Sequence, residues 1–201
     1  MKLFHSPASP FSRKVVACAV TREIDAQIEL VVVNATISPA ALLAVNPLSK
    51  IPTLVTEDGV AIYDSPVICE YLDTIGDAPA LFPPSGRTRW RALQFQAMAD
   101  GIMDAAVLRR AESLRPQEAA RGLNMARQHA AVTRTLAALE SDLPHHIADI
   151  GSLAVACALG YLDLRFAHEP WRDANPALAA WYEAIASQPG LVATTPKDPA
   201  A

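Results

Sequence analysis

The stretch from residue 50 to residue 66 limits what this chain can fold into more than any other part of it. An Ile-Pro pair at 51–52 stands directly before the β-branched and apolar run at 53–55, which predicts a buried strand. An Asp-Gly pair at 58–59 is a strong signal for a tight hairpin, and residues 60–63 predict the returning strand. The stretch therefore predicts a β-hairpin that is introduced by a proline.

A helix is predicted to begin directly after the hairpin, with Ser65 as its N-cap and Pro66 as its first residue, where the missing N–H costs nothing. A cis bond before Pro52, which is typical of a tight turn, turns the backbone of Ile51 outward and leaves it free to pair with an extended peptide. The N–H groups at Ser65 form an anion site nearby. Together these features predict a site for a small peptide that carries a carboxylate at one end.

The residues before this stretch complete a βαβαββα unit of roughly 75 residues. A strand is predicted at 2–5, and a helix follows it with Ser9 as N-cap and a proline in the first position. The run at 28–33, apolar apart from Glu29, predicts a second strand that is buried on both faces. A short helix at 38–45, capped by Ser38, precedes the hairpin.

Beyond the hairpin unit the sequence pattern changes from alternating strands and helices to helices alone. Residues 77–86 contain three prolines and predict a linker between domains. No strand is predicted after it, and helical periodicity or uniform apolarity predicts helices at 90–108, 116–143, 153–162 and 176–187. The helix at 153–162 is expected to be central and buried, and the proline-rich tail after 187 is expected to be loose. An α/β domain is therefore followed by an all-helical one.

Composition excludes several classes of protein. A formal net charge of −4 speaks against nucleic acid as a partner, because phosphate binding needs a basic face. No apolar run reaches the ~20 residues of a membrane span, and no secretory signal is evident. The widely spaced Cys18, Cys69 and Cys157 have apolar neighbours and predict reduced, buried thiols in a cytoplasmic protein. The pair at 145–146, two histidines, has no third ligand at a useful spacing, so no metal site is expected.

The motif of Ile51-Pro52 before a hairpin, followed by Asp64-Ser65 at a helix start, resembles the glutathione site of the glutathione S-transferase family. The family has a thioredoxin-like α/β domain followed by an all-α domain. The resemblance implies that residues 1–77 bind glutathione and that residues 84–201 line the site of the electrophile. It further implies a cytoplasmic, homodimeric detoxification enzyme that uses glutathione as co-substrate without a metal and adds its thiol to a small hydrophobic electrophile.

Residues 9–15, Ser-Pro-Phe-Ser-Arg-Lys-Val, resemble the first-helix motif of serine-type transferases of the theta, tau and related bacterial groups. In these a serine hydroxyl donates a hydrogen bond to the sulfur of glutathione. A free thiol has a pKa of ~8.5, and both a hydroxyl donor and a helix N-terminus favour the thiolate. Ser9 is thus the candidate catalytic residue. Ser6 and Ser12 are rivals, and simple N-capping is the alternative role of Ser9.

Two other residue types used by the family near the first strand are missing. His5 occupies the neighbourhood of the tyrosine used by other classes, and no cysteine is found there that could form a mixed disulfide. Both absences favour conjugation, or a related addition, over deglutathionylation.

The resemblance assigns the parts of glutathione to particular residues. The backbone of Ile51, oriented by Pro52, holds the cysteinyl part. Ser65 and its N–H bind the γ-glutamyl carboxylate, and Asp64 pairs with the γ-glutamyl amine. Lys50 is the candidate for the glycyl carboxylate, with a solvated surface lysine as the alternative.

Residues farther along the chain are assigned in the same way. Asp104 matches a position from which some classes send an acid across the dimer interface to the γ-glutamyl amine, and solvation is its alternative role. Four residues are candidates for lining the electrophile site: Phe11, Met103, Val107 and Arg110, the last as a possible anion contact. Residues 146–149 resemble the family's capping box, with His146 in place of the hydroxyl residue and Asp149 left to bond backbone N–H groups.

Two other functions remain open. One is a glutathione-dependent isomerase or dehalogenase acting on a small acid, although the Ser-Ser-Cys motif of the maleylacetoacetate isomerases is missing. The other is a non-catalytic binding protein with the same fold. The near-complete set of glutathione-binding residues speaks against such a loss of chemistry.

Overall fold

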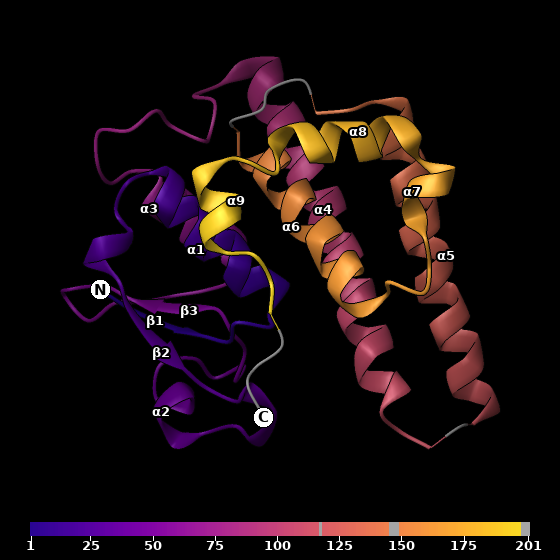
Figure 1. Ribbon diagram of the computed structural model, residues 1–201. Coiled ribbons are helices and arrows are strands. Elements are labelled where there is room, and N and C mark those ends of the chain that lie inside the picture. Colours follow the sequence, from indigo (N-terminus) through magenta and orange to yellow (C-terminus); the bar gives the residue numbers. More distant parts are fainter. Residues whose placement is uncertain (117, 145–148, 198–201) are drawn as a thin grey trace.

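The computed structural model describes residues 1–116, 118–144 and 149–197. An N-terminal α/β domain and a C-terminal helical domain lie side by side (Figure 1). The four-stranded sheet has the order β2-β1-β3-β4. Its strands are β1 (Lys2–His5), β2 (Glu29–Val32), β3 (Thr53–Val55) and β4 (Ala61–Ile62). β1 pairs parallel with β2 and antiparallel with β3, and β3 pairs antiparallel with β4.

The helices of the first domain cover both faces of this sheet (Figure 1). Helices α1 (Pro10–Thr21) and α3 (Ser65–Leu72) lie on one face, and the single turn α2 (Ala40–Leu43) lies on the other. The order of elements confirms the thioredoxin-like βαβαββα unit. The apolar stripe of α1 faces the core, where Val15 and Cys18 are fully buried.

The prediction that the second strand is buried on both faces is wrong. β2 is an edge strand, with Leu30 48% and Val32 67% exposed. An apolar run indicates a strand but not its place in the sheet. That place is set by the crossover through α1, which puts β2 outside β1.

Two helix boundaries also differ from the predicted ones. Ser38 does not cap the helix at 38–45. It adopts a left-handed conformation, with φ 46°, after a short 3₁₀ turn (Ala35–Ile37), and Pro39 precedes α2. Asp64, rather than Ser65, is the N-cap of α3, which begins one residue earlier than predicted. Helix ends fray, and their boundaries commonly shift by one or two residues.

The second domain is helical throughout its described part. It contains α4 (Gly86–Ser113), α5 (Ala119–Ser141), α6 (Ile150–Arg165), α7 (Trp171–Ala174), α8 (Pro176–Ile185) and α9 (Pro189–Ala193). As predicted, α6 is central, and its residues 150–162 are all buried. None of the described helices is both long and apolar enough to cross a membrane.

Residues 189–193, the first part of the tail that was expected to be loose, form a helix instead. Pro189 begins α9 instead of only ending α8, because proline fits the first position of a helix. Gly190 lies so close to Ala17 of α1 that a Cβ there would meet the Ala17 carbonyl oxygen at 2.6 Å. Arg13 of α1 donates a hydrogen bond to the Leu191 carbonyl oxygen at 3.4 Å. Helix α9 is thereby fastened to the first domain.

The capping box of α6 begins three residues later than the resemblance suggests. Asp149 is the N-cap, and its Oδ1 accepts a hydrogen bond from the Ser152 N–H at 2.9 Å. The Ser152 hydroxyl accepts one in return from the Asp149 N–H at 3.2 Å. His145 and His146, which were considered for a metal site and for the cap, lie outside the described residues.

Candidate functional site

Three turns meet at one end of the sheet. The pairing of Phe4 with Thr53 places the end of β1 beside the start of β3, and the pairing of Leu54 with Ile62 brings the end of β4 to the same place. The turn before α1, the turn at Ile51 and the start of α3 are therefore neighbours. Residues 50–66 and the first-helix motif at residues 9–15 therefore form one site.

The turn at Ile51 has the predicted cis bond to Pro52. Two side chains stabilise this turn, because Asn46 Nδ2 and Thr53 Oγ1 both donate hydrogen bonds to the Lys50 carbonyl oxygen, at 3.1 and 2.8 Å. Among the described residues, none makes a hydrogen bond with the N–H or C=O of Ile51. This half-buried backbone is therefore free to pair with a ligand peptide.

The start of α3 offers unpaired backbone donors. Ser65 is its first residue and is 2% exposed, and the N-cap Asp64 makes no side-chain capping bond. The first N–H groups of a helix have no acceptor within the helix and lie at its positive end. The eight-residue α3 can thus receive a carboxylate at Ser65, while the exposed Asp64 carboxylate can receive an amine.

Ser9 is the N-cap of α1, as predicted. Its Oγ accepts a hydrogen bond from the Ser12 N–H at 3.2 Å. The hydroxyl proton is not used by this bond, so capping and donation to a sulfur are compatible. Of the two rivals, Ser12 is 1% exposed and its Oγ accepts from the Ser6 N–H at 3.4 Å. Ser12 therefore stabilises the turn, whereas the half-buried Ser6 precedes it.

Charged groups from both domains converge on this site. Burial raises the pKa of Asp104 on α4, the charge of Lys50 opposes this shift, and the Asp64 carboxylate adds to it. Lys50 and Asp64 are thus within the range at which their charges act on the Asp104 carboxyl of the same chain. The structure thus brings together the three charged residues that the sequence assigned to glutathione.

Sequence reasoning missed an ion pair behind this cluster. Lys14 of α1 is fully buried, and its Nζ lies 2.6 Å from Asp100 Oδ1 on α4. Burial raises the pKa of Asp100, Lys14 lowers it, and Asp64 and Asp104 raise it further. The signal in the sequence was a lysine on the same helix face as Val15 and Cys18.

The four candidates for the electrophile site differ in how deeply they are buried. Phe11, Val107 and Arg110 are half-buried, and so keep surface that a substrate can reach. Met103 is fully buried and belongs to the hydrophobic core. The sequence pattern could not show how deeply Met103 is buried.

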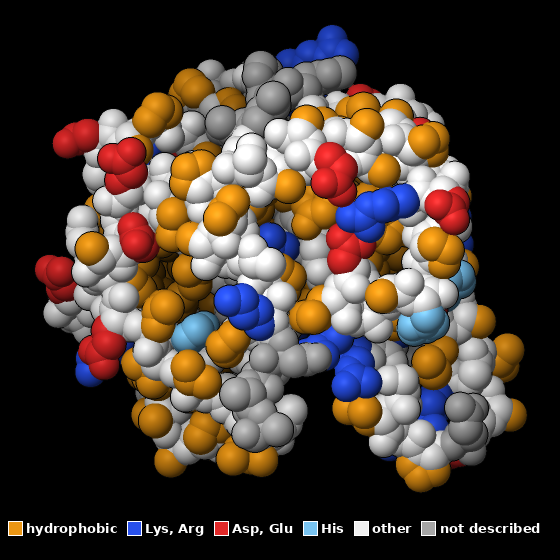
Figure 2. Space-filling view, in the orientation of Figure 1, with side chains coloured by type: hydrophobic (Ala, Val, Ile, Leu, Met, Phe, Trp, Pro, Cys, Tyr) orange, Lys and Arg blue, Asp and Glu red, His pale blue; other side chains and the backbone are white. Residues whose placement is uncertain are grey.

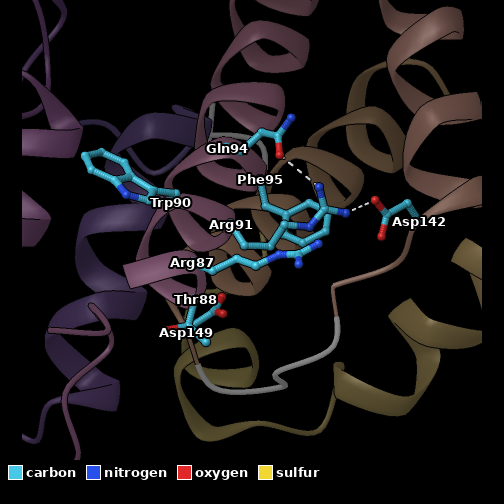
Figure 3. Close-up of a pocket in the computed structure, with 8 residues that line it drawn as sticks. All are labelled: Arg87, Thr88, Trp90, Arg91, Gln94, Phe95, Asp142 and Asp149. Carbon is cyan, nitrogen blue, oxygen red and sulfur yellow. Dashed lines mark hydrogen bonds and ion pairs between the residues drawn. The ribbon is translucent and has the colours of Figure 1, made fainter. Parts of the chain in front are cut away.

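Two cavities lie away from these residues. One of about 590 Å³ adjoins the start of α4 (Figure 3). There Arg91 is already engaged by Gln94 and Asp142, and it covers the Phe95 ring at 4.3 Å. The other, of about 350 Å³, lies between α5, the end of α6 and α7. Neither contains a residue that the sequence assigned to glutathione.

The cysteines lie outside the site, and all three are buried and free of disulfide bonds. The pKa of Cys18 is raised well above its usual range, first by its hydrogen bond with Cys69 and then by burial. Burial likewise raises the pKa of Cys157. None of the three is suited to act as a nucleophile. Among the described residues, no group of three His, Cys, Asp or Glu side chains could hold a metal ion.

Comparison with known proteins follows the division into two domains. Residues 8–75 match the glutathione S-transferase N-terminal domain, and residues 123–184 match the glutathione S-transferase C-terminal domain. The chain is 34% identical over 202 residues to the uncharacterized GST-like protein YibF of Escherichia coli (strain K12), a match that covers 98% of each chain.

Solved structures show the same likeness. A glutathione transferase family member from Pseudomonas fluorescens Pf-5 with bound glutathione is 42% identical, with a TM-score of 0.92 over 98% of each chain. Another structure from this source, with bound S-(propanoic acid)-glutathione, is 41% identical, with a TM-score of 0.88 over 98% of this chain and 100% of that one. A glutathione S-transferase from Methylobacillus flagellatus KT with glutathione bound is 33% identical, with a TM-score of 0.87 over 98% of this chain and 99% of that one. On its architecture, on both domain matches and on these identities, this chain belongs to the glutathione S-transferase family.

Proposed function

We propose that this protein is a glutathione transferase that activates the thiol of glutathione and adds it to an electrophilic carbon. The observation that carries the proposal is the position of Ser9, whose hydroxyl proton is available at the N-terminus of α1 beside the Ile51 turn. Residues 1–77 form the glutathione-binding part, and residues 84–201 line the electrophile site. The relatives with bound glutathione support the choice of co-substrate.

Each part of glutathione has a partner in this proposal. The γ-glutamyl carboxylate binds at Ser65 and its amine at Asp64 and Asp104. The cysteinyl part pairs with the backbone of Ile51, and Lys50 binds the glycyl carboxylate. The nearness of Lys50 and Asp64 to Asp104 supports a role for Asp104 within its own subunit.

The chemistry follows from the thiolate. The Ser9 hydroxyl donates a hydrogen bond to the sulfur, and the positive end of α1 favours its negative charge, so the thiol loses its proton to solvent at a lower pH. The thiolate then forms an S–C bond with the electrophile. With a chloro-nitroaromatic acceptor, chloride leaves with the electron pair of the broken C–Cl bond.

Retention on immobilised glutathione, together with turnover of a chloro-nitroaromatic acceptor, tests this function. We expect retention, elution by free glutathione, and formation of the aromatic thioether at a rate proportional to enzyme. Retention without turnover of any acceptor would show a non-catalytic glutathione-binding protein. Passage through the column without turnover would remove glutathione from the proposal altogether.

A glutathione-dependent reaction on a small acid is the second candidate. The relative with bound S-(propanoic acid)-glutathione favours it, since that ligand is a thioether between glutathione and a three-carbon acid. Replacement of a halide on such an acid forms this thioether and releases the halide ion. Halide release that matches glutathione consumption, measured with a halogenated propanoate, distinguishes it from transfer to aromatic acceptors alone.

We further propose that the protein is a cytoplasmic homodimer, as its reduced cysteines and exposed apolar side chains suggest. Val60, Val67 and Trp90 are 53%, 50% and 69% exposed, and Trp90 extends from α4 away from the arginines beside it (Figure 3). Apolar surface of this kind marks interfaces.

Trp90→Glu is expected to weaken the dimer at least tenfold, because it places a charge in an apolar contact. Sedimentation velocity over a range of concentrations measures this. Leu123→Glu is the control, since Leu123 is 77% exposed on α5, in the other part of the helical domain. A monomeric wild type, or equal dissociation constants for Trp90→Glu and wild type, would contradict this interface.

A further inference from the structure

The cavity between α5, the end of α6 and α7 takes its walls from three elements. Residues at helical spacing on one face of α5 form the first wall, and they are His129, Val132, Thr133 and Leu136. Leu162 and Phe166, one turn apart on α6, form the second, and the single turn α7 adds Trp171. Helices α5 and α7 lie on the side of the helical domain that faces away from the first domain (Figure 1). The cavity is therefore separate from the glutathione site.

The interior of this cavity is apolar. Five of its lining side chains are apolar and more than nine-tenths buried, namely Val132, Leu136, Leu162, Phe166 and Trp171. Protein interiors have few voids larger than a water molecule. The volume of about 350 Å³ lies instead at the lower end of the range for small-ligand sites, about 300–1,000 Å³. Size and walls together favour an apolar molecule of one or two rings.

Polar groups gather at one end of the cavity, around the Glu169 carboxylate. Its Oε1 accepts a hydrogen bond from Arg109 Nη2 of α4, and its Oε2 lies 3.3 Å from His129 Nδ1. The exposed His168 Nε2 lies 3.5 Å from Oε1. Figure 2 shows histidine side chains at the surface on this side of the helical domain, beside apolar ones. A carboxylate has about four acceptor positions, so Glu169 can accept one more hydrogen bond from a ligand.

The charge of Glu169 selects among ligands. Burial raises the pKa of Glu169, but the hydrogen bond and charge of Arg109 and the charges of the two histidines lower it below its ordinary value, so the carboxyl is ionised at neutral pH. The Arg109 guanidinium lies 4.3 Å from the centre of the Phe166 ring, and of these two charged groups it is Glu169 that lines the cavity. An anionic ligand would meet this carboxylate and lose its hydration, and both effects oppose its binding. A neutral O–H or N–H group suits the site.

We propose that this cavity is a second ligand site, which binds small neutral aromatic molecules that carry a hydrogen-bond donor, such as phenols. The ring packs against Phe166 and Trp171, and the donor bonds the Glu169 carboxylate. None of the residues assigned to glutathione lines the cavity. The site can therefore be occupied while the glutathione site is in use, and its existence does not depend on the transferase reaction.

Three matched ligands test the chemistry of the site by equilibrium dialysis at pH 7. 2-Naphthol has the ring and the donor, 2-methoxynaphthalene lacks the donor, and 2-naphthoate carries a negative charge. We expect 2-naphthol to bind most tightly, and 2-naphthoate to bind about tenfold more weakly or worse, because it meets the Glu169 carboxylate. Wild type that does not bind 2-naphthol, or that binds 2-naphthoate equally well, would overturn the proposal.

Filling the cavity tests where 2-naphthol binds. Ala174 on α7 and Thr133 on α5 are exposed residues on opposite walls. Ala174→Trp or Thr133→Trp is expected to weaken 2-naphthol binding about tenfold or more, because the indole takes the space of the ligand. Ala138→Trp is the matched control, since Ala138 is exposed on α5 but does not line the cavity. Unchanged affinity in both filled variants would show that 2-naphthol binds elsewhere and would refute this site.

Glu169→Gln tests the role of the carboxylate. The variant leaves the buried Arg109 without the carboxylate that it pairs with in the native protein. An anionic ligand can then supply the missing charge, so 2-naphthoate is expected to bind more tightly than 2-naphthol. An unchanged preference for 2-naphthol in folded Glu169→Gln would contradict the assigned role of Glu169. If this variant does not fold, the filled variants and the three ligands still decide the proposal.

Discussion

Ser9→Ala is expected to lower kcat/KM for thiol addition about 10- to 100-fold at pH 7, because one hydrogen bond to a charged group is worth roughly 1.5–3 kcal/mol. The variant keeps the N-terminus of α1 and the Ile51 turn but loses the hydroxyl that donates to the sulfur. Stopped-flow or steady-state measurement with a chloro-nitroaromatic acceptor gives this rate. Retention on immobilised glutathione should persist in the variant, since the peptide contacts are elsewhere.

The deficit of Ser9→Ala should depend on pH in a definite direction. The hydroxyl lowers the pKa of the bound thiol, so its removal raises that pKa toward the value of the free thiol, ~8.5. At pH values below the lower pKa, both proteins carry mostly thiol and their rates differ most. At pH values above the higher pKa, both carry thiolate and their rates converge. The ratio of wild-type to variant rates should therefore shrink as the pH rises through 8 to 10.

The rival serines supply the controls. Ser6→Ala should retain most of the activity, because the Ser6 N–H, not its side chain, bonds the turn. Ser12→Ala removes the buried acceptor of that bond and should lower stability by about 1–2 kcal/mol, with a smaller change in the thiol pKa. If Ser6→Ala shifts the pH–rate profile and Ser9→Ala does not, the catalytic assignment of Ser9 is wrong.

Lys14→Met is expected to cost about 3–5 kcal/mol of folding free energy, the largest stability effect proposed for this chain. It leaves the Asp100 carboxylate at the domain interface without the ammonium that lies 2.6 Å away in the native protein. Urea unfolding at pH 7, followed by circular dichroism, measures the loss. Lys2→Met is the matched control, because the Lys2–Glu29 pair is largely exposed, and it should cost less than about 1 kcal/mol.

Acid should partly relieve this defect. The folded-state pKa of Asp100 is raised by burial even in the wild type, and removal of Lys14 takes away the group that lowers it. A carboxyl with a raised folded pKa destabilises the fold at pH values above that pKa and ceases to do so once it is protonated. The stability deficit of Lys14→Met should therefore shrink as the pH falls through this value. Lys14→Met/Asp100→Leu should recover much of the loss at pH 7, and a loss that stays the same in both variants would show a packing defect instead.

Much of the candidate site follows from short sequence motifs. The cis bond at Pro52 and the helix start at Ser9 involve residues close in the chain, so turn and cap preferences were enough to predict them. The edge position of β2 and the anchoring of α9 were not predictable in this way. They depend on which element packs against which. An apolar run looks the same in an edge strand and in a central strand, and a proline looks the same where it ends one helix and where it begins the next.

By itself the sequence determined the order of elements in the first domain and the stretch from Ile51 to Ser65 on which a peptide can bind, because these depend on local backbone preferences, and its motifs indicated the family. Only the tertiary structure decided which distant charges meet. Lys14 reaches Asp100 across the domains, and the charges of Lys50 and Asp64 act on Asp104. The physical reason is that helix periodicity gives the direction of a side chain on its own helix but not the neighbour it meets, which the packing of α1, α4 and α6 fixes.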